Sequence, residues 1–156
     1  MQGKNDKLHQ VNVTYAGIED RLLLRVTTRL GNEYRVWLTR RFTGLLLAIL
    51  DKAMDQYGGA ASLGASPKTK AMFKAGAMEK AFDEEKTTNF PLGKKGFLAY
   101  GIKSADTPEG NLHVEIFPEK GAGVSQTLDE PRLYMFHDLL TQWIARAEWR
   151  LRHGQD

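Results

Sequence analysis

The apolar residues of the segment RLLLRVTTRLGNEYRVWLTRRF, residues 21–42, change their period partway along, and this change constrains the fold more than any other feature. Its first arginines recur every four residues, a spacing that fits one stripe of a helix or one face of a strand. A helix would scatter the leucines around its circumference, whereas the β-branched run at 26–28 favours a pleated strand. We therefore predict a strand with two faces. The apolar face carries Leu22, Leu24, Val26, Thr28 and Leu30, and the other face carries Arg21, Leu23, Arg25, Thr27 and Arg29.

A Gly-Asn-Glu sequence at 31–33 marks a turn, because Gly and Asn tolerate positive φ. The alternation then resumes through residue 39, which predicts a β-hairpin. Pairing Leu30 with Tyr34 keeps both apolar sets on one side and makes 31–33 a three-residue loop, the register that we favour. A two-residue loop would instead place Trp37 opposite Val26 on the apolar side.

The period lengthens to three and four residues after Thr39, which predicts an amphipathic helix that stops at Gly58-Gly59. Thr39 or Thr43 is expected to cap its first turn. Upstream, the sequence VNVTYAGI at 11–18 alternates and predicts another strand, so residues 11–57 read β-β-β-α. The apolar stripe of the helix contains Phe42, Leu45, Leu46, Ile49, Leu50, Ala53, Met54 and Tyr57.

Residues 97–152 repeat this order, with strands expected at 97–104, 111–118 and 123–128 and a helix that begins at Asp129. At an offset of 90 residues apolar positions coincide, although any two hairpin-plus-helix units would align to some extent. Residues 58–96 connect the halves through a small-residue loop and a weaker helix at 67–86.

We predict one α+β domain over residues 1–156, built from two pseudo-repeated antiparallel sheet-plus-helix units around a shared helical core.

This arrangement resembles the Whirly family, and it is similar to the single-stranded-DNA-binding transcriptional coactivators, in which one sheet-plus-helix unit dimerises. The resemblance covers most of the chain and rests on topology. Plant Whirly proteins carry a Lys-Gly-Lys-Ala-Ala-Leu-like motif on an early strand; residues 11–40 lack it, and GKKG at 93–96 is a faint echo. The resemblance implies packed helices, outward-facing sheets that bind single-stranded DNA or RNA, and assembly into a homo-oligomer.

Arginines concentrate on the polar face of the predicted hairpin. Residues 21–41 contain six arginines and one acid, Glu33, and so carry +5, more than the whole chain's +3. Guanidinium groups neutralise phosphates and stack on bases, and an aromatic among them suits a single-strand platform. This pattern predicts a non-catalytic single-stranded nucleic-acid-binding protein. The residues assigned to binding are Arg21, Arg25, Thr27, Arg29, Arg35, Trp37, Arg40 and Arg41.

A different interpretation stays open, because arginines on exposed strands also keep sheets soluble. Trp37 would then be covered by the N-terminal segment or by an oligomer partner. The alternative function is a protein–protein interaction or assembly module with no nucleic-acid role. No catalytic residue, metal site or cofactor is predicted: the four histidines are scattered, and His137 is expected to be a satisfied boundary residue. Without cysteine or an apolar run of membrane-spanning length, we expect a cytoplasmic protein with no membrane partner.

Overall fold

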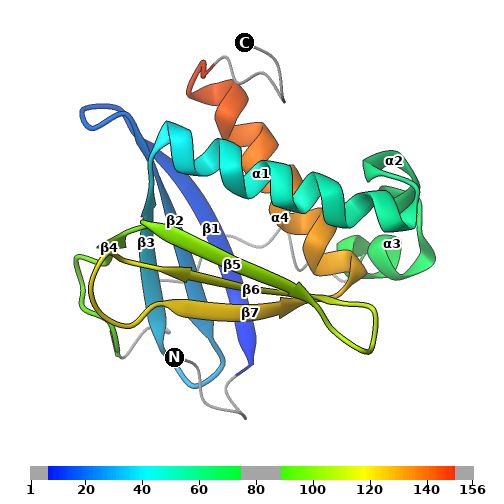
Figure 1. Ribbon diagram of the computed structural model, residues 1–156, viewed down its shortest axis with the longest axis horizontal. Coiled ribbons are helices and arrows are strands. Elements are labelled where there is room, and N and C mark those ends of the chain that lie inside the picture. Colours follow the sequence, from blue (N-terminus) through cyan, green and yellow to red (C-terminus); the bar gives the residue numbers. More distant parts are fainter. Residues whose placement is uncertain (1–6, 75–88, 150–156) are drawn as a thin grey trace.

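The computed structural model describes residues 7–74 and 89–149 of the chain, which form an α+β fold with two sheets. The sheet order is β1-β2-β3-β4 in the first sheet and β5-β6-β7 in the second. Figure 1 shows the second sheet crossing in front of the first. The long helices α1 and α4 lie on the β5 side of the second sheet (Figure 1). The strands are β1 (Leu8–Ala16), β2 (Arg21–Thr28), β3 (Glu33–Leu38), β4 (Phe97–Leu98), β5 (Gly101–Asp106), β6 (Leu112–Phe117) and β7 (Val124–Leu128).

The two long helices begin where their capping residues predict. The Thr39 hydroxyl accepts a hydrogen bond from the Phe42 amide at 3.1 Å, and the Asp129 carboxylate accepts one from the Arg132 amide at 3.1 Å. The weaker helix expected at 67–86 is described only to Lys74, and its remainder lies outside the described residues. The helices are α1 (Arg40–Met54), the 3-10 turn η1 (Asp55–Tyr57), α2 (Ala60–Gly64), α3 (Pro67–Lys74) and α4 (Glu130–Arg146).

The repeat extends to the pairing of the strands. In the first sheet Leu22 lies opposite Leu38, and in the second Leu112 lies opposite Leu128, so both hairpins have the same register at the offset of 90 residues. The hairpins also bury the same face: the even-numbered positions from Leu22 to Val26 and from Leu112 to Ile116 are all buried.

The predicted loop of the first hairpin, residues 31–33, lies two residues too far toward the C-terminus. Tyr34 pairs with Val26 rather than with Leu30, and the three loop residues are 29–31. Thr28 closes this loop, because its amide donates to the Asn32 carbonyl at 2.9 Å and its hydroxyl accepts from the Asn32 amide at 3.2 Å. Gly31 takes the left-handed conformation, φ 86°, that ends a three-residue hairpin loop. The shift by an even number preserves both faces and leaves Leu30 68% exposed in the turn.

The strand expected at 97–104 is in fact two strands that belong to different sheets. β4 pairs in parallel with β3, whereas β5 pairs with β6. The chain changes sheets at Ala99 and Tyr100: the Ala99 amide donates to the Trp37 carbonyl and the Tyr100 amide donates to the Phe117 carbonyl, both at 2.9 Å. Residues 97–100 therefore join one corner of the first sheet to the second.

One apolar core lies between the sheets and the long helices. The apolar stripe predicted for α1 is confirmed except at its margin, where Leu45 is 46% exposed and Leu47 is buried instead. The buried side chains come from both sheets, from α1 and from α4, which fits the prediction of two units that share one core.

Candidate functional site

The polar face of the first hairpin is the face turned away from this core, and we call it the outer face. Across it Arg25 lies opposite Arg35, and Leu23 lies opposite Trp37, which in turn neighbours Leu98 of β4. Thr27 lies opposite Glu33. The strand pairing thus brings together three of the predicted binding residues, two arginines and the tryptophan.

Glu33 holds the two arginines of the outer face. Its carboxylate accepts from Arg25 at 3.0 and 3.3 Å and from Arg35 Nε at 2.5 Å. The Glu33 side chain is 1% exposed, compared with 13% for Arg25 and 24% for Arg35. Two guanidinium groups around one carboxylate leave one positive charge in excess, so the cluster keeps a basic character.

The expectation that this face is uncovered is wrong for two residues. Thr27 is 3% exposed and its hydroxyl bonds the Gln10 backbone, with the Gln10 amide donating at 3.1 Å. Arg25 shows little of its side chain to solvent. Arg35 and Trp37, both partly exposed, are the accessible part of the predicted hairpin site.

An edge segment, residues 89–96, borders Arg35 and Trp37. It begins at a bridge between Asn89 and Asn32, where the Glu33 amide donates to the Asn89 carbonyl at 2.9 Å. Further along, Arg35 Nη1 donates to the Lys94 carbonyl and Trp37 Nε1 donates to the Lys95 carbonyl, each at 2.9 Å. These bonds place two lysines beside the predicted arginine and tryptophan.

The edge segment also supplies an aromatic ring close to two cations. The Arg35 guanidinium lies 4.9 Å from the centre of the Phe90 ring, and the Lys94 ammonium lies 5.8 Å from it. Lys94 and Lys95 are exposed, whereas Phe90 is half-buried. Gly96 permits the close approach of the segment, because a Cβ there would collide with the Arg35 carbonyl oxygen.

The sequence did not predict Phe90, Lys94 or Lys95 as site residues. Their one local signal is the GKKG sequence at 93–96, in which flanking glycines let the backbone pass close to a neighbouring strand. Their position depends on contacts with residues 58 and 59 positions earlier, which no local pattern predicts.

The other predicted arginines do not join this cluster. Arg29 is exposed in the hairpin turn, whereas Arg21 is half-buried at the other end of β2, two residues from Leu23, the cross-strand partner of Trp37. Arg40 pairs with Asp20 at 2.6 Å and lies 5.4 Å from the ring centre of Trp149. Arg41 is exposed on the first turn of α1. The eight predicted residues therefore lie in three separate places.

His137 is a satisfied boundary residue, as predicted. Its Nε2 lies 2.6 Å from the Asp51 carboxylate, which links α4 to α1. Within residues 7–74 and 89–149, no group of three histidine or acidic side chains is arranged to hold a metal ion. Over the same residues, no helix combines the length and apolarity needed to cross a membrane.

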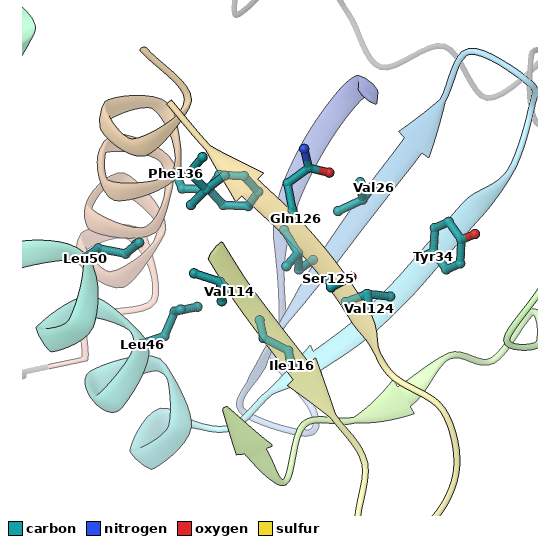
Figure 2. A pocket seen from close by; sticks show the side chains of 12 residues that line it. Val26, Tyr34, Leu46, Leu50, Val114, Ile116, Val124, Ser125, Gln126 and Phe136 are labelled. Carbon is teal, nitrogen blue, oxygen red and sulfur yellow. The ribbon is translucent and has the colours of Figure 1, made fainter. Parts of the chain in front are cut away.

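A cavity of about 50 Å³ lies between the two sheets, and Figure 2 shows the side chains around it. Its lining is apolar apart from Ser125, Gln126 and the Tyr34 hydroxyl group. Gln126 Oε1 is buried there with no hydrogen-bond partner among the described residues. Such a volume holds a few water molecules and is well below the roughly 300 Å³ of small ligand pockets. We therefore assign no ligand to it.

Comparison with protein-family models, with curated proteins and with solved structures finds no match to this chain. The resemblance to Whirly proteins consequently remains a prediction.

Proposed function

We propose that the protein binds single-stranded DNA or RNA without catalysing a reaction, and that the site is formed by Arg35, Trp37 and the edge segment. The observation that carries this proposal is the convergence of Lys94 and Lys95 on the Arg35–Trp37 corner of the outer face. Cations and aromatic rings in one shallow surface are the two components of single-strand binding sites.

Each component has a role in the proposed complex. Lys94 and Lys95 direct their ammonium groups to the phosphates, and Arg35 adds part of a charge because Glu33 offsets the rest. The Trp37 ring and the Phe90 ring offer stacking surfaces, which contribute about 1–3 kcal/mol per stacked base. A duplex hides the faces of its bases, so this site favours a single strand.

The test is a titration of fluorescein-labelled oligothymidine, followed by anisotropy at low salt. The double substitution Lys94→Glu/Lys95→Glu is expected to weaken binding at least about tenfold, because two phosphate contacts become repulsive. The matched control is Lys68→Glu/Lys70→Glu, which changes the same charge at exposed positions of α3, on the other side of the molecule (Figure 1). Equal loss in both variants would mean general electrostatics and would contradict this site.

Substitutions at Trp37 measure the contribution of stacking to the affinity without changing the charge of the site. Trp37→Phe keeps an aromatic face and is expected to retain most of the affinity, whereas Trp37→Ala is expected to lose it by the stacking contribution. Both variants lose the bond to the Lys95 carbonyl, so a difference between them reports the ring. Full affinity in Trp37→Ala, with an unchanged circular dichroism spectrum, would remove the tryptophan from the site.

A second candidate is an assembly module that forms a homo-oligomer or contacts another protein. Exposed apolar side chains favour it, since Leu98 is 42% and Tyr100 67% exposed beside Trp37. Light scattering distinguishes the two candidates: a defined oligomer that Leu98→Asp and Tyr100→Ser disrupt, with no oligonucleotide bound at low salt, would favour assembly.

A further inference from the structure

A groove of about 300 Å³ separates α1 from β5, and we call it the β5–α1 groove. It is independent of the outer face, because it lies on the second sheet and its walls come from other residues. Ile49 and Ala53 of α1 and Leu112 of β6 supply its apolar surface. Ser104, Ala105 and Asp106 form the strand wall, and Lys52 and Gln56 stand on the helix wall.

β5 is an edge strand. It ends the order β5-β6-β7, and in the part of the chain that the structure describes β6 is the strand that pairs with it. Residues 103–106 are all exposed. On an edge strand every second residue turns its amide and carbonyl away from the neighbour, so these groups are available to a further strand.

The helix turns this edge into one wall of a groove. Figure 1 shows α1 running alongside β5 in nearly the same direction. One end is closed by the hydrogen bond from Gln56 Nε2 to Asp106 Oδ1 at 3.3 Å. The three strand residues that line the groove span about 7–10 Å, enough for about three residues of an extended peptide.

We propose that the β5–α1 groove binds an extended peptide segment of a partner protein, which adds to the sheet as a strand beside β5. Strand addition takes its affinity from main-chain hydrogen bonds and its specificity from pockets for alternate side chains. One peptide side chain is apolar and covers Ile49, Ala53 and Leu112. The next side chain on that face is acidic and reaches the Lys52 ammonium group.

The charges of the groove select the acidic residue. Lys52 and Asp106 are the two charged residues in its walls, and they act at different places, because Asp106 bonds Gln56, one helical turn beyond Lys52. Lys52 is exposed on the rim, so its ammonium is accessible to an incoming carboxylate. A basic peptide would meet like charge at this position.

The experiment selects a displayed library of random octapeptides against the full chain and then titrates the enriched sequence as a synthetic peptide. We expect alternating apolar residues with one Asp or Glu, and amide shifts in the nuclear magnetic resonance spectrum confined to residues 103–106 and 49–56. Lys52→Glu is expected to weaken the affinity for this peptide about tenfold. The same variant is expected to bind more tightly a peptide in which the acidic residue is replaced by Lys. Lys68→Glu, an exposed site on α3, should change neither affinity.

Five results would overturn the proposal. The library yields no enriched sequence, or the peptide binds Lys52→Glu as tightly as the parent, or its amide shifts lie outside β5 and α1. Shifts in β5 that depend on protein concentration without any peptide would assign the edge to a second copy of this chain instead. Binding by a peptide with N-methylated alternate amides, equal to that of the parent peptide, would exclude strand addition.

Discussion

Glu33 is the residue on which the outer face depends. Its buried carboxylate stands between two arginines that face each other across β2 and β3 and would otherwise repel one another. Removing one partner of a buried ion pair leaves uncompensated charge, which costs more than the pair itself contributes.

Glu33→Gln is therefore expected to lower the free energy of unfolding by about 3 kcal/mol. The amide keeps the size of the side chain but supplies neither charge nor a second acceptor oxygen to the arginines. Urea denaturation followed by circular dichroism measures the change. Glu109→Gln, at an exposed turn position, is the control and should stay within about 0.5 kcal/mol of the parent protein. A change in the free energy of unfolding of Glu33→Gln no larger than that of the control would contradict the role assigned to this carboxylate.

Among the elements, the turn between β1 and β2 forms a hydrogen bond with the residues that directly follow α4. The Asp20 carboxylate accepts from the Trp149 indole and the Tyr15 hydroxyl, both at 2.7 Å, and from Arg40 at the start of α1 at 2.6 Å. Trp149 is 4% exposed and packs edge-on to Tyr15, with ring centres 6.2 Å apart. One carboxylate thus connects a turn and two helices.

This connection predicts a dependence of stability on pH. Hydrogen bonds from Trp149 and then Tyr15 lower the pKa of the Asp20 carboxyl group below its usual value. A group whose pKa is lowered by folding stabilises the fold above its unfolded pKa, and this contribution is lost as the pH falls through the folded pKa. Asp20→Asn should therefore lower the free energy of unfolding at pH 7. Below about pH 4 the difference in the free energy of unfolding between the variant and the parent protein should become progressively smaller. Urea denaturation at both pH values tests this, and an equal difference at both would contradict it.

The elements also show what the sequence could predict. The alternation of apolar residues located both hairpins, and the change of period at Thr39 and the cap at Asp129 located both long helices. The register of the first hairpin was wrong because the apolar pattern favoured burying Leu30, whereas the Thr28 hydroxyl and the left-handed Gly31 close the loop earlier. An even shift satisfies the same pattern, so only turn chemistry distinguishes the two registers.

The candidate site was predictable only in its hairpin half. The positions of Arg35 and Trp37 follow from alternation, but alternation encodes neither the contact of Thr27 with Gln10 of β1 nor the pairing of Arg25 with Glu33 across the hairpin. The split of 97–104 between two sheets was missed for the same reason, because Ala99 and Tyr100 bond to strands distant in sequence.

For the molecule as a whole, the repeat is structural and not electrostatic. The two hairpins share a register, yet the corresponding face of the second sheet carries His113, Glu115 and Phe117 where the first carries Leu23, Arg25 and Thr27. The cations are concentrated in one half, to which the edge segment adds two lysines, so the proposed binding site lies on one of the two sheets.

This asymmetry predicts the salt dependence of binding. Contacts from Lys94, Lys95 and Arg35 to three phosphates give a slope of about −2 for the logarithm of affinity against the logarithm of salt concentration, since each contact on a single strand contributes about −0.7. Oligothymidine titrations between about 50 and 200 mM salt measure it. A slope of about −4 would show that Arg29, Arg40 and Arg41 also contact the strand, and a slope of zero would exclude phosphate contacts.

The corner at Ala99 and Tyr100 determines how the two sheets can move. Neighbouring residues of one chain are bonded to different sheets there, so neither sheet can slide along the other without breaking a backbone hydrogen bond. A rotation about that corner would keep both of these hydrogen bonds. The corner lies beside Trp37 at the end of β3, and β5 begins directly after it at Gly101. A rotation of this kind would therefore change the tilt of the outer face and the width of the β5–α1 groove together.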